Sequence, residues 1–120
     1  MTEKGLLLVA SSAVATVVAN LLMRAGIERL GGIEFIPRGL LKLILEPRVA
    51  FGFLVYGAAV LVWFRVIATE ELSTSYPLLV GLTFVLITLG AITLFGERVN
   101  VPKLAGMALI LIGVVVVARS

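Results

Sequence analysis

The stretch LSTSYPLLVGLTFVLITLGAITLFG, residues 72–96, carries no charged residue over 25 positions. A helix needs about 20 mainly apolar residues to cross the hydrocarbon core of a bilayer, so this run is long enough to span one. The whole chain has the matching composition: 61% of its 120 residues are hydrophobic and 14% are charged. Soluble domains are about 45–50% apolar and about 25% charged. The sequence therefore predicts an integral membrane protein.

Three further uncharged runs predict three more spans: residues 5–23, 49–64 and 104–118. The second becomes long enough if it continues past Arg65, whose long side chain can reach toward the interface. The fourth needs Pro102 at its start, and proline suits a first helical turn. The predicted spans are 4–24, 48–69, 73–96 and 101–119.

We expect these spans to make residues 1–120 a single four-helix transmembrane domain. The first span follows a basic residue, Lys4, as the apolar region of a signal peptide does. Its 19-residue run is longer than the usual 7–15 residues, and no small-residue cleavage site ends it, so we expect the span to be retained. The short links after residues 69 and 96 predict that the helices they join are antiparallel neighbours.

The first connection is long and predicts a fifth, short helix. Residues 36–46 mix apolar and charged side chains between two prolines, Pro37 and Pro47, which act as helix breakers. This pattern favours an interfacial helix lying along the membrane surface. The alternative is a loop that is simply rich in apolar residues.

The distribution of basic residues predicts the orientation. Seven lie at the first and third connections, whereas three lie at the termini and the second connection. The positive-inside rule then places the first and third connections in the cytoplasm and both termini outside. The seven are Arg24, Arg29, Arg38, Lys42, Arg48, Arg98 and Lys103; the three are Lys4, Arg65 and Arg119.

Several function classes are disfavoured by what the sequence lacks. It contains no cysteine and no histidine, which removes disulfides, thiolate metal sites and imidazole general bases. It has no paired carboxylates and no glycine-rich phosphate loop, so we expect neither an enzyme nor a metal or cofactor site. The net charge of +3 comes from residues between apolar blocks. These read as membrane-surface charges, and no nucleic-acid partner is expected.

Polar residues inside the first span form a candidate substrate surface. Ser12, Thr16 and Asn20 recur every four residues, and Arg24 follows at the same interval. Polar groups are costly in hydrocarbon, so they tend to face a bundle interior or a cavity. A polar stripe that ends in a guanidinium suits a hydroxylated or phosphorylated head group. The alternative is hydrogen bonding between helices, with Arg24 anchored at head-group level.

The second and third spans supply further candidates for substrate binding. Trp63 is also typical of an interfacial aromatic belt, and Arg65 could either reach the interface or contact a phosphate. Pro77 can kink the third span and free carbonyls beside Tyr76. Glu97 and Arg98 are expected to cap the end of that span. The remaining candidates on these spans are Tyr56, Ser75 and Thr83.

The fourth span carries a candidate dimer seam formed by Gly106, Ile110 and Gly113. Small residues let helix backbones approach closely in lipid, where packing drives association. A single copy of four short helices encloses little space, so a dimer is expected. The glycines could equally pack against the third span of the same chain.

The chain resembles the small multidrug resistance family of the drug/metabolite transporter superfamily. The resemblance rests on residues 73–82 (STSYPLLVGL), 94–98 (LFGER) and 102–114 (PKLAGMALILIGV), with 15–24 (ATVVANLLMR) similar to the family's first helix. It implies antiparallel dimers of four-helix chains with the fourth helices in contact. It would assign Gly106 and Gly113 to that contact.

Two departures from the family pattern bear on the substrate. Cation-exporting members carry a glutamate in the first helix, where this chain has Thr16, and Leu79 replaces an aromatic residue. The long first connection, the run that begins at Pro47, and Ser75-Tyr-Pro77 are more similar to another branch. That branch holds the small flippase subunits for aminoarabinose-phosphoundecaprenol, which implies a polyprenyl-phosphate-linked sugar or a similar anionic lipid as substrate.

Three functions are therefore considered for a multi-pass protein of the inner or plasma membrane. The leading one is a flippase of a lipid-linked anionic head group. The second is proton-coupled efflux of small cationic or hydrophobic compounds, and the third is a membrane assembly partner that does not itself transport. The expected partners are bilayer lipid, a lipid-linked or small-molecule substrate, and a second copy or a related small subunit.

Overall fold

A computed structural model describes residues 3–120, which fold into five helices with no strand. Four of the helices are long and apolar enough to cross a membrane. The prediction of an all-α membrane protein with four spans and one short helix is confirmed. The helices are α1 (Glu3–Leu30), α2 (Pro37–Leu45), α3 (Pro47–Thr69), α4 (Leu72–Phe95) and α5 (Val101–Arg119).

The first helix is longer than its predicted span of 4–24. It continues to Leu30, six residues beyond the predicted end, and so measures about 42 Å at 1.5 Å per residue. The prediction stopped at the first charged residue, but a helix need not end where the hydrocarbon does. An ion pair between Arg24 and Glu28, four residues apart, supports the extra turns. The other three spans begin and end within one residue of their predicted limits.

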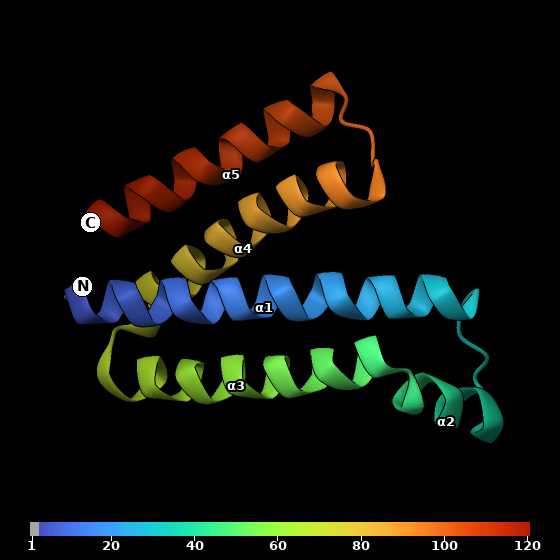
Figure 1. Cartoon of the computed structure of the whole chain (residues 1–120). Helices are drawn as coiled ribbons and strands as arrows, with labels where there is room; N and C mark the ends of the chain where they lie inside the picture. The colour runs from blue at the N-terminus through green and yellow to red at the C-terminus, as the bar shows by residue number, and fades with distance from the viewer. Residues whose placement is uncertain (1–2) are drawn as a thin grey trace.

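The four long helices lie side by side in the order α3, α1, α4, α5 (Figure 1). Helix α1 is central and packs on α3 and on α4, while α5 contacts α4 alone among the described helices. The prediction that α3 and α4 are neighbours is wrong, because α1 lies between them and they meet only weakly. A short link brings two helix ends together, but the packing faces decide which helices become neighbours.

Small residues join α1 to α3 along an antiparallel seam. The hydroxyl of Ser12 donates a hydrogen bond of 3.0 Å to the carbonyl of Ala59. A side chain at Gly52 would lie 3.0 Å from the carbonyl oxygen of Ala19, so the backbones are close there. Near the end of the seam, a side chain at Gly26 of α1 would meet Val49 of α3. Close backbone approach through small residues is the usual way in which helices associate in lipid.

Glycines also set the packing of α4. A side chain at Gly90 would meet Leu21 of α1, and one at Gly81 would meet Val114 of α5. These two glycines are therefore points of close approach between helices. A side chain at Gly57 of α3 would meet no atom within 4 Å, so this glycine is not one of them.

Helix α2 lies at one end of the array and begins with Pro37 in its first turn. None of its nine residues, all of which the structure describes, is buried. It exposes the apolar side chains of Leu40, Leu41, Ile44 and Leu45. An amphipathic helix with an unburied apolar face suits the interface of a membrane. Its location at the membrane surface stays a prediction.

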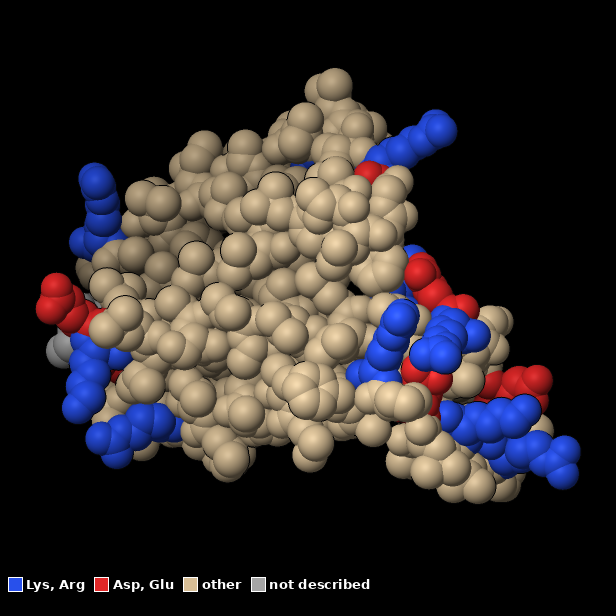
Figure 2. Space-filling model, viewed as in Figure 1, with Lys and Arg blue, Asp and Glu red and all other residues tan. Residues whose placement is uncertain are grey.

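Charged residues gather at the two ends of the molecule and leave an uncharged band between them (Figure 2). The end where α1 meets α2, and where α4 turns into α5, carries the basic residues of the first and third connections. Such a band is what a bilayer requires of a protein that spans it. The structure thus agrees with a multi-pass membrane protein.

The charge bias predicts which end faces the cytoplasm. The chain contains no cysteine, so Phe35→Cys and Ser120→Cys each introduce a single labelling site at exposed positions. A membrane-impermeant maleimide should label Ser120→Cys in intact cells and label Phe35→Cys only after the cells are opened. Labelling of Phe35→Cys alone would reverse the orientation, and equal labelling of both would show insertion in two orientations.

The seam between α1 and α3 predicts unequal effects for two glycine substitutions. Gly52→Val forces a side chain against Met23 and the Ala19 carbonyl and should destabilise the protein by about 1–3 kcal/mol. Gly57→Val, in the same helix, is the matched control and should change stability little. Thermal unfolding in detergent measures both. Equal destabilisation by the two variants would contradict the described packing.

Candidate functional site

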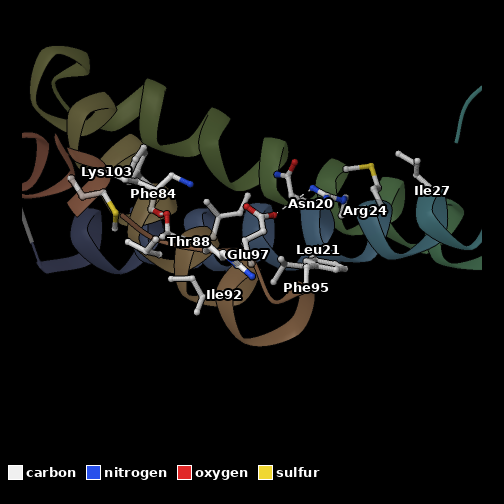
Figure 3. A pocket seen from close by; sticks show the side chains of 16 residues that line it. Asn20, Leu21, Arg24, Ile27, Phe84, Thr88, Ile92, Phe95, Glu97 and Lys103 are labelled. Carbon is white, nitrogen blue, oxygen red and sulfur yellow. Dashed lines mark hydrogen bonds and ion pairs between the residues drawn. The ribbon is translucent and has the colours of Figure 1, made fainter. Parts of the chain in front are cut away.

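A cavity of about 540 Å³ opens between α1, α4 and the start of α5, beside the connection from α4 to α5. We call it the Arg24 cavity. Figure 3 shows side chains from α1 and α4 facing it, with Glu97 directed toward Arg24. It is lined by Asn20, Leu21, Met23, Arg24, Ile27, Phe84, Ile87, Thr88, Ala91, Ile92, Phe95, Glu97, Arg98, Val99, Lys103 and Met107.

Arg24 is the centre of the polar contacts in this cavity. Its Nε lies 3.1 Å from a carboxylate oxygen of Glu28, and its Nη1 lies 3.5 Å from Glu97. The guanidinium carbon is 5.3 Å from the ring centroid of Phe95, within the range of a cation–π contact. The pair with Glu97 joins α1 to the connection between α4 and α5. Arg24 therefore bridges two walls of the cavity.

Local sequence holds Glu97 in place. Gly96 ends α4 in a left-handed conformation (φ 63°), which glycine adopts without strain, and the amide of Glu97 donates back to the carbonyl of Ala91 at 3.3 Å. Three residues later, Asn100 caps α5 by accepting a hydrogen bond of 2.9 Å from the Lys103 amide. The connection is thus fixed at both ends, and Glu97 turns toward α1.

The cavity has an excess of positive charge. Arg24, Arg98 and Lys103 line it, against one carboxylate, that of Glu97. Within residues 3–120, neither Arg98 nor Lys103 forms an ion pair. Guanidinium and ammonium groups are suited to phosphate oxygens, and an arginine can bind them with two parallel hydrogen bonds. The arrangement can therefore hold an anionic head group.

The remainder of the wall is mainly apolar. It comes mainly from α4, with Phe84, Ile87 and Ile92, and from Met107 of α5. The polar Thr88 on this wall donates its hydroxyl to the carbonyl of Phe84 at 2.7 Å. A surface of this kind accepts a hydrocarbon chain. Charge at one end and an apolar wall beside it match an amphiphilic ligand.

A second, shallower hollow lies on another side of α1, between α1 and the ends of α3 and α4. This groove of about 740 Å³ carries Arg29 and Arg48 and shares Leu21 and Phe95 with the Arg24 cavity. These two apolar side chains therefore separate the two spaces. The other lining residues are Val18, Leu22, Ala25, Glu28 and Leu94.

The predicted polar stripe of α1 is only partly brought together. Asn20 and Arg24 line the Arg24 cavity, whereas Ser12 is buried against α3 and Thr16 donates to the carbonyl of Ser12 at 2.8 Å. The reason is helix geometry, because residues four apart turn by about 40° at each step. From Ser12 to Arg24 the stripe rotates by about 120°, which moves it from one neighbouring helix to a different face.

The candidates on α3 and α4 lie outside both spaces. The rings of Trp63 and Tyr76 are in contact, with centroids 5.9 Å apart, and Tyr56 is exposed. Ser75 is fully buried and donates to the carbonyl of Glu71 at 2.8 Å, a bond within the first turn of α4. None of these residues lines the Arg24 cavity.

Arg65 and Thr83 also lie apart from the cavity. Arg65 is near the end of α3 remote from α2, whereas Arg24 is near the opposite end of the bundle. The two arginines therefore cannot hold one phosphate within a single chain. The hydroxyl oxygen of Thr83 is buried and, among the described residues, has no hydrogen-bond partner.

The candidate dimer seam on α5 is unoccupied within the chain. Gly106 and Gly113 have no atom within 4 Å of an added side chain, and Ile110 is exposed. None of the 19 residues of α5, all of them described, is buried. The alternative that these glycines pack against the preceding span is therefore excluded for this chain. A dimer through α5 stays a prediction.

Three charged residues of the cavity were not predicted as ligand contacts: Glu97, Arg98 and Lys103. From sequence, the first two were expected to cap the third span, and the lysine was counted among the basic residues that predict the orientation. A signal was present, since these charges lie on a short connection that must meet another part of the bundle. Which part it meets, however, depends on the tilt of α4 relative to α1.

Comparison with known proteins places the chain in a family. A model of the Small Multidrug Resistance protein family matches residues 40–110, which is more than half of the chain. The chain belongs to this family. As a Small Multidrug Resistance protein with four spanning helices, it is a multi-pass protein of the cell membrane.

Relatives of this Small Multidrug Resistance protein include one full-length match and several partial ones. An uncharacterized protein, y4nH, from Sinorhizobium fredii is 29% identical over all 120 residues and 99% of its own length. The probable 4-amino-4-deoxy-L-arabinose-phosphoundecaprenol flippase subunit ArnE from Pseudomonas aeruginosa is 42% identical over 56% of this chain.

The protein of the same name from Pectobacterium atrosepticum is 42% identical over 58% of this chain. These alignments cover 57% and 65% of the respective flippase subunits. No solved structure gives a significant match to the chain.

The positions of Ser12 and Asn20 predict that a substitution at Ser12 affects stability, whereas one at Asn20 affects transport. Ser12→Ala removes the bond to the Ala59 carbonyl and should lower stability by about 0.6–1 kcal/mol without weakening ligand binding. Asn20→Leu changes the cavity wall and should abolish transport while leaving dimerisation intact. A flipping assay in vesicles, with unfolding curves for both variants, measures this. Wild-type transport by Asn20→Leu would reduce the polar stripe to a structural role.

Proposed function

We propose that this chain is a small membrane transporter that flips a polyprenyl-phosphate-linked sugar, or a similar anionic lipid, between the leaflets. The observation that carries the proposal is the Arg24 cavity, in which three basic side chains adjoin an apolar wall. The basic groups suit the phosphate, and the wall suits the first isoprene units of the lipid. The sugar would lie toward Asn20, whose amide can hydrogen-bond to hydroxyl groups.

The location of the cavity supports a lipid substrate. Figure 2 shows an uncharged band that meets a charged end of the molecule. The cavity combines basic residues of that end with apolar residues of α4. A lipid in the cytoplasmic leaflet holds its phosphate at this depth and its tail in the band. A head group could therefore enter the cavity sideways while the tail remains in the bilayer. The partial similarity to flippase subunits named for a phosphoundecaprenol-linked sugar supports the same chemistry.

Efflux of cations is the competing function, and the distribution of carboxylates counts against it. Exporters of organic cations need a carboxylate inside the membrane, and the middle of α1 carries Thr16 at the matching position. The one buried carboxylate among the described residues is that of Glu46, at the junction of α2 and α3. It lines neither the cavity nor the groove.

We further propose that the transporter works as a dimer or with a related small subunit. The unburied apolar surface of α5, with Gly106 and Gly113 open to close approach, is suited to a second helix. A single chain arranges its helices as a flat array, and its Arg24 cavity is open to the outside. A second copy would enlarge the enclosed space.

Native mass spectrometry tests the proposed function directly. The gently extracted protein is offered undecaprenyl phosphate and the lipophilic cation tetraphenylphosphonium together. A dimer should retain the phosphate lipid, and Arg24→Ala should weaken its binding by roughly ten-fold or more, the loss expected for a charge-assisted contact.

Arg65→Ala is the informative comparison, because Arg65 lies near the opposite end of the bundle and should leave binding unchanged. Retention of the cation in place of the lipid would overturn the flippase proposal. Retention of neither would favour an assembly partner that does not transport.

A further inference from the structure

The pair formed by Arg24 and Glu97 has a consequence for which head group the cavity can accept. The two side chains approach to 3.5 Å from opposite walls, and both are partly exposed, at 52% and 39%. An ion pair this exposed contributes little to stability and can be exchanged for another partner at small cost. A phosphate that binds Arg24 must therefore compete with Glu97 and can displace it.

Displacement of Glu97 from Arg24 makes the binding of a purely anionic ligand less favourable. The backbone of Glu97 is held at the cavity, because Gly96 and the Asn100 cap fix the short connection that carries it. After the exchange, its carboxylate would lie beside the bound phosphate, and two like charges at this distance repel each other. Arg98 and Lys103 reduce the repulsion but are themselves suited to the phosphate oxygens.

A head group that carries a cation next to its phosphate offsets the repulsion between the Glu97 carboxylate and the phosphate. Its phosphate binds Arg24, and its ammonium group forms an ion pair with the carboxylate of Glu97. One ion pair across the cavity is then replaced by two pairs with the ligand, and the carboxylate of Glu97 keeps a cationic partner. An amino sugar linked through phosphate has this chemistry, because a single ring separates its amine from its phosphate.

We propose that Glu97 is the specificity-determining residue of the Arg24 cavity: it pairs with Arg24 in the empty protein and with a cationic amine of the head group in the complex. This inference rests on the proposed function, since it assumes that a lipid phosphate binds Arg24. It goes beyond that function because it assigns the selection of the head group to the carboxylate of Glu97. This carboxylate favours zwitterionic head groups over head groups that carry phosphate alone.

Glu28 offers a matched comparison. It also pairs with Arg24, at 3.1 Å, but it does so from the same helix, one turn away. It lines the groove on the other side of α1 and is not part of the Arg24 cavity. Removal of its charge should therefore leave the discrimination between head groups unchanged, although it frees Arg24 to a similar extent.

The test compares two lipids that differ in one group. These are 4-amino-4-deoxy-L-arabinose-phosphoundecaprenol and the corresponding lipid with a hydroxyl at the position of the amine. Native mass spectrometry of the full chain with both lipids gives the ratio of their affinities. The wild type should prefer the amino lipid by roughly three- to ten-fold, a range typical of one partly exposed ion pair.

Glu97→Gln, which is close in shape and needs no repacking at a partly exposed site, should bring this ratio close to one while both lipids still bind. Glu28→Gln should keep the ratio of the wild type. A wild type that binds both lipids equally, or a Glu97→Gln variant that keeps the preference, would overturn the role of Glu97 and leave the flippase proposal standing. Absence of binding by either lipid to the wild type would overturn both.

Discussion

Hydrocarbon offers no hydrogen-bond partners, and this constraint determines where the chain can bind anything polar. Inside the spans, most side-chain hydroxyl and amide groups form hydrogen bonds within the protein. Thr16 and Thr88 donate to carbonyls of their own helices, and Ser12 donates across to α3. Asn20 also donates to its own helix, but among the described residues its amide oxygen accepts no hydrogen bond, so it stays available on the cavity wall. Groups with spare capacity for a ligand are found where the helices leave the apolar band. The Arg24 cavity lies there, and its charge comes from Arg24 in the last third of α1 and from Glu97, Arg98 and Lys103 around the connection between α4 and α5.

The seam between α1 and α3 gives that cavity its shape. Small residues draw these two helices together along their length, and α1 thereby becomes the central element of the array. Helix α4 contacts α1 as well, but the two diverge toward the end where α4 turns into α5 (Figure 1). The space that opens between them is the Arg24 cavity. Tight packing on one side of α1 thus accompanies an opening on the other.

Much of the architecture could be predicted from the sequence, because span length and hydrophobicity are local properties. The limits of α3, α4 and α5 follow from Pro47, Gly96 and Pro102, which begin or end helices for backbone reasons.

The candidate site depended on contacts between helices. Asn20 and Arg24 were found from their spacing, but Glu97 was assigned to a helix end, because its approach to Arg24 is set by how α4 is tilted. Ser12 was predicted to belong to the same stripe, but the structure places it at the seam with α3, because the helical twist rotates it away from the face of Arg24.

The central claim is that a lipid phosphate binds between Arg24 and the connection from α4 to α5. Photo-crosslinking tests it most directly, with an undecaprenyl phosphate analogue that carries a diazirine on the first isoprene unit and with peptide mapping of the products. We predict crosslinks on two segments, residues 20–27 of α1 and 84–107 of α4 and α5, and their loss in Arg24→Ala. Crosslinks confined to α3 around Tyr56 and Arg65 would contradict the claim.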